Sequence, residues 1–236
     1  MTVTIDSRAV HVVGGARTSV LVAFTAVDTP MVVVDVCGLR APVIDALTLA
    51  LAIERPAIVI SAAGTDDATT AYTRIIGPRE RAVQDLLPDA VTLRTAPVAE
   101  DLEIYADAAG GAAYHAFGSA STPWVVADDV AAVADSASAD IVAGDTRRCG
   151  HALVVTGAQP CGAEELLTAM GVTPIGLEAT ELRSSLVASG HPTAAVDVVL
   201  AHQEWAGLAL DASPTVLRAL DRPPSDPLTT LARGHR

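Results

Sequence analysis

Two adjacent carboxylates follow an apolar run near the middle of the chain. Asp128 and Asp129 come directly after residues 124–127, which read as a buried strand, and they open a stretch with helical spacing. Asp is a favoured N-cap, because its carboxylate accepts hydrogen bonds from the free N–H groups of the first helical turn. The pair therefore predicts a helix start, and capping alone accounts for one of the two carboxylates.

Cysteine and histidine are the other side chains that could carry chemistry. The three cysteines, Cys37, Cys149 and Cys161, form neither an even disulfide set nor a CxxC pair, which indicates a reducing, cytoplasmic compartment. Cys161 stands between a predicted strand and a predicted helix, where a displaced nucleophile would lie. A free cysteine is more often a small buried hydrophobe. None of the six histidines lies three or four residues from another His or Cys, so we expect no metal site.

Composition excludes several classes of protein. The chain contains no lysine, which removes a Walker lysine and a Schiff-base lysine, and no GxGxxG, HExxH or GxSxG motif is present. We therefore expect no cofactor. A net charge of −13 argues against nucleic-acid or anionic-membrane binding. No apolar run reaches the roughly 18–20 residues of a membrane span.

Strands and helices alternate along the chain, which predicts one soluble α/β domain with a mainly parallel sheet. Half of the 236 residues are hydrophobic and only 3% are aromatic, so small branched side chains must fill the core. We see no linker that would divide the chain. Strands are predicted at residues 2–5, 9–13, 19–24, 31–36, 57–61, 91–94, 124–127, 151–156 and 195–201. Helices are predicted at residues 41–53, 66–76, 78–87, 100–117, 128–142, 163–170, 178–188 and 213–220.

Residues 106–159 carry a more specific pattern. A small-residue helix leads to a Thr-Pro turn, the strand WVVA, the turn DDVAA, an Ala-rich helix and the strand HALVVTGAQ. Further matches are ELRSSLVASGHPTAAVDVVLAHQ, ERPAIVISAAGTDDATTAY and the final TTLARGHR. In order and spacing these segments resemble the β-ketoacyl synthases (ketosynthases) and chain-length factors of type II polyketide synthases. The resemblance covers roughly residues 55–236 and implies a thiolase-like, layered α/β/α fold with an abbreviated second half.

The resemblance also implies what is missing. Asp129 occupies the position of the nucleophilic cysteine, as in chain-length factors, which also lack it. His202 matches the first family histidine without its Gly-Thr-Gly-Thr loop, and His235 matches the second without its lysine. Asp129, His202 and His235 are therefore expected to be vestigial, with no catalytic residue remaining. The implied role is an inert, cytoplasmic subunit in polyketide (antibiotic) or fatty-acid-like biosynthesis, in a hetero- or homodimer with a ketosynthase-type protein and possibly contacting an acyl carrier protein.

Two alternatives stay open at this point. One keeps the fold and gives it acyl-transfer or hydrolytic chemistry, using Cys161 or Asp129 together with His202. The other is an acidic scaffold or regulatory protein that binds no acyl group.

Overall fold

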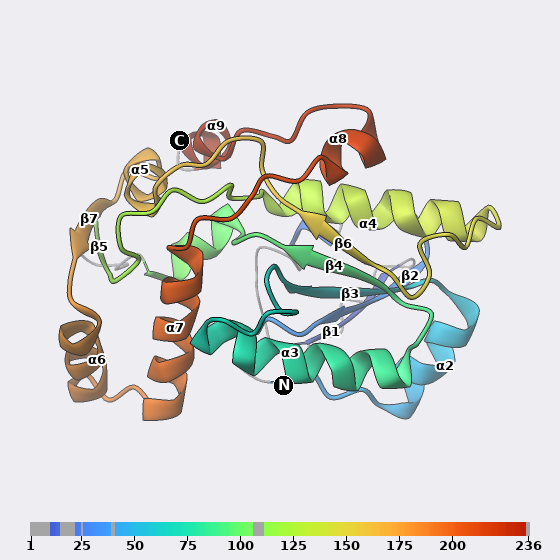
Figure 1. The fold of residues 1–236 in the computed structure, drawn as a ribbon, viewed down its shortest axis with the longest axis horizontal. Helices are drawn as coiled ribbons and strands as arrows, with labels where there is room; N and C mark the ends of the chain where they lie inside the picture. The colour runs from blue at the N-terminus through green and yellow to red at the C-terminus, as the bar shows by residue number, and fades with distance from the viewer. Residues whose placement is uncertain (1–9, 15–21, 25, 39–40, 106–110, 235–236) are drawn as a thin grey trace.

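The computed structural model describes residues 10–14, 22–24, 26–38, 41–105 and 111–234 (Figure 1). Its main element is a five-stranded, all-parallel sheet in the order β1-β2-β3-β4-β6. The central strands are runs rich in Val, Ile and Leu, as expected of strands that are buried on both faces. The five strands are β1 (Val10–Gly14), β2 (Met31–Asp35), β3 (Ala57–Ala62), β4 (Val91–Thr95) and β6 (Ala152–Val155).

Successive side chains of each strand point to opposite faces of the sheet, and each face has its own helical layer. Val32 and Val34 lie in the core that α2 and α3 cover. Val33 and Ile58 lie in the core that α4 and α8 cover. The helices of these two layers are α2 (Ala46–Glu54), α3 (Ala71–Leu86), α4 (Ala127–Val142) and α8 (Thr215–Leu220).

A smaller unit lies beyond the carboxyl ends of the main strands, at the left of Figure 1. It contains a two-stranded parallel sheet, and its helix α7 packs against α3 of the main unit. Its elements are η1 (Ala99–Tyr105), β5 (Ala112–His115), α5 (Ala163–Ala169), β7 (Thr173–Gly176), α6 (Ala179–Ala188), α7 (Thr193–Ala206) and α9 (Pro227–Gly234). Within the described ranges, no helix is long and apolar enough to cross a membrane.

The thiolase-like arrangement expected from the sequence is wrong. Residues 195–201, expected as the strand that leads to the ketosynthase histidine, lie inside α7. Residues 100–117, expected as one long helix, form η1 and β5 in their described part. Both errors fall in segments that carried the resemblance. Their cause is physical: a short apolar run such as AAVDVVLA suits a buried strand and a helix equally well.

Of the other predicted helices and strands, some are confirmed and some are wrong. The strands at 31–36, 57–61, 91–94 and 151–156 and the helix at 128–142 are confirmed within one or two residues. Residues 124–127 are buried but do not join the sheet, because only Val125 pairs there, in an isolated bridge with Val98. The two helices expected at 66–76 and 78–87 are one helix, α3, which continues through Pro78. The strand predicted at 2–5 lies outside the described residues.

Candidate functional site

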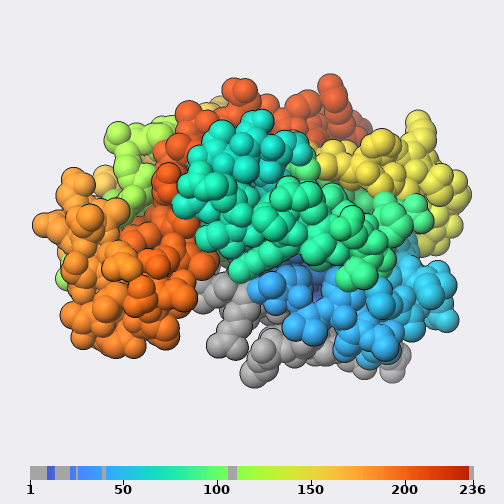
Figure 2. Space-filling model, turned by 60° about the horizontal axis from the view of Figure 1, so that its bottom comes forward, coloured from blue at the N-terminus to red at the C-terminus, as the bar shows by residue number. Residues whose placement is uncertain are grey.

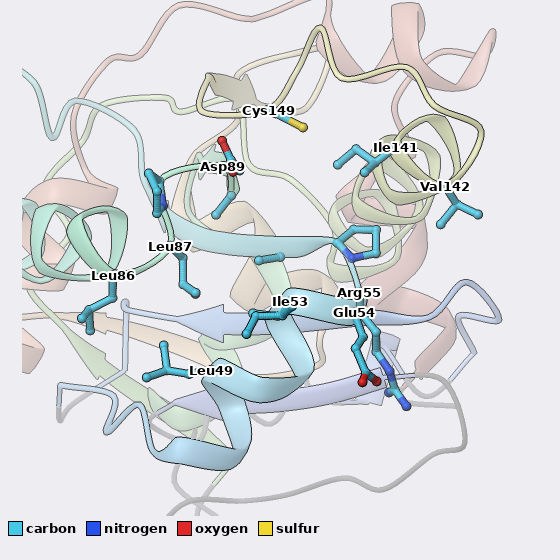
Figure 3. A pocket seen from close by; sticks show the side chains of 15 residues that line it. Leu49, Ile53, Glu54, Arg55, Leu86, Leu87, Asp89, Ile141, Val142 and Cys149 are labelled. Carbon is cyan, nitrogen blue, oxygen red and sulfur yellow. The ribbon is translucent and has the colours of Figure 1, made fainter.

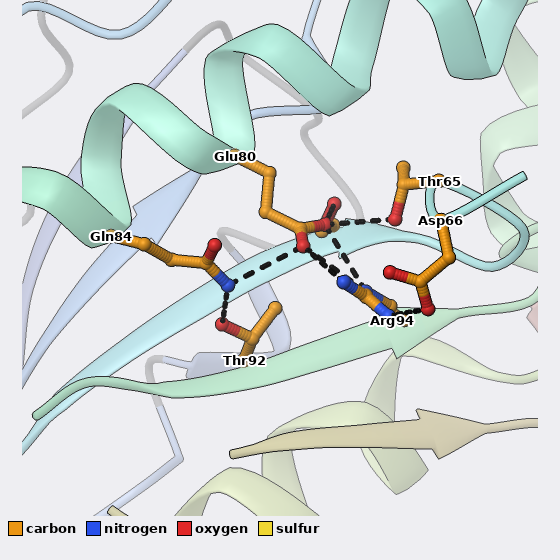
Figure 4. Close-up of polar contacts among 7 residues, drawn as sticks. Thr65, Asp66, Glu80, Gln84, Thr92 and Arg94 are labelled. Atoms are coloured by element: carbon orange, nitrogen blue, oxygen red, sulfur yellow. Dashed lines mark hydrogen bonds and ion pairs between the residues drawn. The ribbon is translucent and has the colours of Figure 1, made fainter. Parts of the chain in front are cut away.

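The carboxyl ends of the five parallel strands meet at one edge of the sheet, which we call the carboxyl edge. Ligands of open parallel sheets bind at this edge, where the strand order reverses. Here Ser61 of β3, Thr65 and Asp66 of the following loop, Glu80 of α3 and Arg94 of β4 form one polar cluster (Figure 4). We call these five residues the Glu80 cluster.

Glu80 is the centre of this cluster and is only 2% exposed. Thr65 Oγ1 donates to Glu80 Oε2 at 3.0 Å, and Ser61 Oγ donates to the same oxygen. Arg94 donates to Glu80 Oε1 through Nη2 at 2.6 Å and through Nε at 3.1 Å. Its Nη1 pairs with the exposed carboxylate of Asp66. Both carboxylate oxygens of Glu80 are therefore occupied by groups of the chain itself.

The charge of Arg94 is fixed by the same contacts. Burial on its own would lower the pKa of Arg94, but the hydrogen bonds and charges of Glu80 and Asp66 outweigh burial and raise it. The guanidinium stays charged and is directed at two carboxylates of the same chain. It is therefore not available to an anionic ligand.

The helices α2 and α3, which begin at the carboxyl edge, carry their own caps. At α2, Asp45 Oδ1 accepts the Thr48 N–H at 2.8 Å, and this backbone hydrogen bond lowers the pKa of Asp45. At α3, Thr70 and Thr73 form a reciprocal capping box. These first-turn N–H groups are the ones that would otherwise bind an anion.

The start of α4 is capped by a carboxylate from another element. Both oxygens of Glu100, in η1, accept the Ala127 N–H at 3.1 Å. Burial, assisted by the nearby charges of Asp101 and Asp128, raises the pKa of Glu100 to about 7 in spite of these hydrogen bonds. An acidic group thus occupies the helix end where a phosphate would be most stable.

Aromatic rings fill the space between the carboxyl edge and α7. Tyr72, Tyr105, Phe117, His202 and Trp205 form a chain of ring contacts with centroid distances of 5.0–6.1 Å. Tyr72 Oη donates to the Cys37 carbonyl at 2.8 Å, and Trp205 Nε1 donates to the Ala63 carbonyl at 2.9 Å. This aromatic cluster fastens α7 to the loops that follow β2 and β3.

Asp129, the expected nucleophile position, is fully buried in the first turn of α4. Its carboxylate accepts hydrogen bonds from Arg222 Nη2 at 2.7 Å, the Ser225 N–H at 2.6 Å and Ser225 Oγ at 3.0 Å. The residue that precedes the helix is Val126, so Asp129 does not cap α4 as the sequence suggested. Asp129 instead anchors the segment between α8 and α9.

The other candidates from the sequence lie in separate environments. Cys161 is 9% exposed, and its backbone pairs with Thr122. Burial, together with the charges of Glu165 and Asp226, raises the pKa of Cys161 to about 11, so its thiolate is disfavoured. His202 Nδ1 lies 2.7 Å from Tyr105 Oη within the aromatic cluster. His235 lies outside the described residues.

His115 was not singled out by sequence reasoning. It ends β5 and is 2% exposed, and neither ring nitrogen has a hydrogen-bond partner. The Glu164 carboxylate lies 3.5 Å from Nε2, but burial dominates and lowers the pKa of His115. No one-dimensional signal marks this residue, because its surroundings come from β5, α5 and β7.

An open cavity lies at the opposite edge of the sheet, where the strands begin; we call this the amino edge (Figure 3). Its volume is about 740 Å³, within the range of small-molecule sites. The lining comes from the last turns of α2, α3 and α4 and from the loops before β3, β4 and β6. The lining residues are Leu49, Ala52, Ile53, Glu54, Arg55, Pro56, Ala57, Leu86, Leu87, Pro88, Asp89, Ala90, Ile141, Val142 and Cys149.

The chain was compared with known proteins. No protein-family model and no curated protein matches it. An NADPH-dependent quinone oxidoreductase from Escherichia coli has a similar structure, with a TM-score of 0.62 and 15% identity over 94% of this chain and 82% of that one. The triphenylmethane reductase of Citrobacter sp., solved with NADP(H), has a TM-score of 0.59 and 16% identity, over 93% of this chain and 80% of that one. A nucleoside-diphosphate-sugar epimerase from Staphylococcus aureus has a TM-score of 0.57 and 14% identity, over 92% of this chain and 82% of that one.

These similarities correct the ketosynthase interpretation. The similar structures are reductases and an epimerase with a nucleotide-binding α/β fold, and no ketosynthase is among them. The chain therefore has the α/β fold of these proteins. The inert ketosynthase-like role in polyketide biosynthesis and its acyl-transfer alternative lose their basis. Pairing with a ketosynthase-type protein stays an untested prediction.

The fold raises the question of whether a nicotinamide dinucleotide fits this chain. Such a cofactor needs a crevice where the strand order reverses, and free N–H groups or cations for its phosphates. In the described sheet each strand pairs with its predecessor and the order does not reverse. The helix ends at the carboxyl edge hold Asp45, Thr70 and Glu100, and Arg94 is paired. The described residues therefore do not fit a nicotinamide dinucleotide.

Proposed function

We propose that this chain is a small-molecule-binding protein that keeps a reductase fold but does not transfer hydride. One observation carries the proposal: in the described part of the carboxyl edge the chain's own side chains occupy the polar positions, while the open cavity lies at the amino edge. A reductase of this fold class needs the carboxyl edge for its dinucleotide. In this chain the polar groups of the carboxyl edge stabilise the fold, and the ligand binds at the amino edge.

Charge supports the same proposal. The chain carries a net charge of −13, and a dinucleotide brings further negative charge on its phosphates. The carboxylates of Asp45 and Asp66 at the carboxyl edge would repel those phosphates, and Glu100 would add to the repulsion as the pH rises above its pKa of about 7. A cofactor would have to displace Glu100 from the start of α4 and bind against that repulsion.

The test is a titration of the purified protein with NADPH and with NADH, followed by nucleotide fluorescence and by the melting temperature. The E. coli quinone oxidoreductase serves as the positive control. We expect neither an emission change nor a melting shift up to millimolar nucleotide. Saturable micromolar binding of either nucleotide would contradict the proposal.

A second candidate is NADPH-linked reduction, as the names of two similar structures suggest for those proteins. One observation favours it: Gly14 ends β1 at the carboxyl edge, and Gly15 follows it in the sequence. Glycine at such a turn is what a phosphate-binding loop requires. The same titration separates the two candidates, because only the second expects saturable nucleotide binding.

A cytoplasmic location remains part of the proposal. It is supported by Cys37, Cys149 and Cys161, which are all free thiols, as is usual in a reducing compartment.

A further inference from the structure

The amino-edge cavity has a distinctive electrostatic character. In each strand–helix–strand unit the helix runs back against the strands, so α2, α3 and α4 all end at the amino edge. Figure 2 shows these ends (blue, green and yellow) gathered at one end of the molecule. A helix C-terminus carries a partial negative charge of about half an electron. Three such ends therefore surround a single cavity.

The helices carry few cations at these ends, although Arg55 follows α2 directly as its C-cap residue. None of the three helices has a basic residue in its last turn. Among the lining residues, Glu54 and Asp89 are exposed carboxylates and Arg55 is the only cation. Near the end of α4, Arg148 pairs with Asp140 at 3.1 Å, so that pair adds no net charge. The cavity is therefore negative at its rim.

The remaining lining is aliphatic and unusually exposed. Ile53 is 87% exposed, Val142 65% and Leu86 54%, although each faces or borders the cavity (Figure 3). Leu49 and Ile141 are partly buried and continue the same apolar surface. A ligand that covers these side chains removes apolar area from water, which stabilises the complex by about 25 cal/mol for each Å² buried. A ligand that suits this site needs an apolar body.

We infer that the amino-edge cavity binds an apolar organic cation, with its hydrocarbon body on Ile53, Leu86 and Val142 and its positive charge near Glu54, Asp89 and the three helix ends. This inference rests on the proposed function, since it names the class of ligand. No aromatic residue is among the lining residues, so the charge is recognised by carboxylates and carbonyl dipoles rather than by an aromatic cage.

The test uses three probes of similar shape and different charge: tetraphenylphosphonium (cation), tetraphenylborate (anion) and triphenylphosphine oxide (neutral). Binding to the full chain is measured by calorimetry and by the melting temperature. Cys149 reports the location, because it lines the cavity and is partly exposed, whereas Cys37 and Cys161 are buried. A bound probe should slow alkylation of Cys149 by N-ethylmaleimide, followed by intact mass.

We expect tetraphenylphosphonium to bind at least about tenfold more tightly than tetraphenylborate and to protect Cys149. Glu54→Gln and Asp89→Asn should each weaken cation binding about two- to fivefold, the size of one solvent-exposed ion contact. Ile53→Arg should abolish cation binding. The matched control Ile104→Arg changes another exposed isoleucine, in η1, which is 67% exposed and is not a lining residue, and should leave binding unchanged.

Each other outcome overturns part of this picture. If tetraphenylborate or the neutral probe binds as tightly as the cation and protects Cys149, the cation inference fails and the proposed function stands. If the cation binds without protecting Cys149, or binds equally to the Ile53→Arg protein, the assigned site is wrong. If none of the three probes binds, both the inference and the small-molecule site of the proposed function fail.

Discussion

The two edges of the main sheet differ in how their polar groups are satisfied. At the carboxyl edge, Glu80 and Arg94 are paired with each other and with neighbouring hydroxyl and carboxylate groups, and Glu100 caps α4. At the amino edge, three helices end around an open cavity, with Ile53 and Val142 exposed. A parallel α/β unit directs helix N-termini to one edge and C-termini to the other, so the first edge suits anions and the second suits cations. In the part of the chain that the structure describes, acidic side chains occupy helix starts at the anion-suited edge, and the open cavity lies at the cation-suited edge.

Among substitutions of charged residues, the largest effect is expected at the Glu80 cluster. Glu80→Gln leaves Arg94 without its buried carboxylate, and we expect the free energy of unfolding to fall by about 3 kcal/mol. Urea unfolding followed by circular dichroism measures it. Asp66→Asn is the matched control, because Asp66 is 72% exposed and its pair with Arg94 is worth less than about 1 kcal/mol. An equal loss in both variants would show that burial of Glu80 is not what makes the cluster strong.

The next effect concerns the anchor at Asp129. Asp129→Asn keeps the shape of the side chain but places an amide NH₂ group against the donors of Arg222 and Ser225. We therefore expect the free energy of unfolding to fall by about 1–3 kcal/mol. Hydrogen exchange should accelerate at the Ser225 amide. The exposed neighbour Asp128 provides the control, with Asp128→Asn expected within about 0.5 kcal/mol of the parent. If Asp129→Asn left the free energy of unfolding unchanged, Asp129 would act as an ordinary helix cap and not as an anchor.

A smaller effect should depend on pH. The pKa of Glu100 is raised from 4.5 to about 7, so the folded state binds this proton more tightly than the unfolded state does. Its contribution to stability is full below pH 4.5 and is lost as the pH rises through 7, by roughly 1–2 kcal/mol for a partly buried group.

Glu100→Gln should remove that part of the pH dependence, measured as the difference in unfolding free energy from the parent between pH 4.5 and 8. The exposed Glu103→Gln protein should keep it. A Glu100→Gln protein whose profile parallels that of the parent would exclude a raised pKa at Glu100.

The smallest effect on stability is expected at the amino edge. Because Ile53 is 87% exposed, Ile53→Gln should change the unfolding free energy by no more than about 0.5 kcal/mol. The same substitution at Ile58, which is fully buried in β3, should prevent folding or cost several kcal/mol, roughly 3–5. A large fall in the free energy of unfolding for Ile53→Gln would mean that the Ile53 side chain packs against the folded protein and is not free to contact a ligand.

Much of the sheet was predictable from the sequence, and the reason is local. Residues 31–36, 57–61 and 91–94 are runs of four to six residues rich in β-branched side chains, and their short length and flanking turn residues favour a buried strand over a helix. The run at 195–201 has the same composition but lies in a helix, because its flanking residues continue the helical pattern over Thr193–Ala206. The ketosynthase resemblance rested on Ala, Gly and Val, which are common to many α/β proteins and carry little information about family.

The sites were less predictable than the sheet, because their partners are distant along the chain. Asp129 meets residues 93 and 96 positions away, and Tyr105 meets His202 at a separation of 97. From sequence alone, Asp129 looked like a helix cap or a lost nucleophile, and nothing local points to Arg222. The amino-edge cavity is likewise formed by three helix ends that no motif connects.

The consecutive order of the main strands also has a consequence for how the protein is made. Each of β2, β3, β4 and β6 pairs with the strand that precedes it in the sheet, so the sheet can grow in the direction of synthesis. The paired residues are 21 to 60 positions apart, from Val10↔Met31 to Thr92↔Ala152, so each pairing closes a long loop and parallel pairing of this kind is slow. All residues that pair in the main sheet nevertheless precede residue 156, so they leave the ribosome before the C-terminal helices do. The packing of α7 on α3 must wait until Thr193–Ala206 has left the ribosome, and the Asp129 anchor must wait for Arg222 and Ser225. We therefore expect a nascent chain that carries a formed sheet before its C-terminal helices are docked.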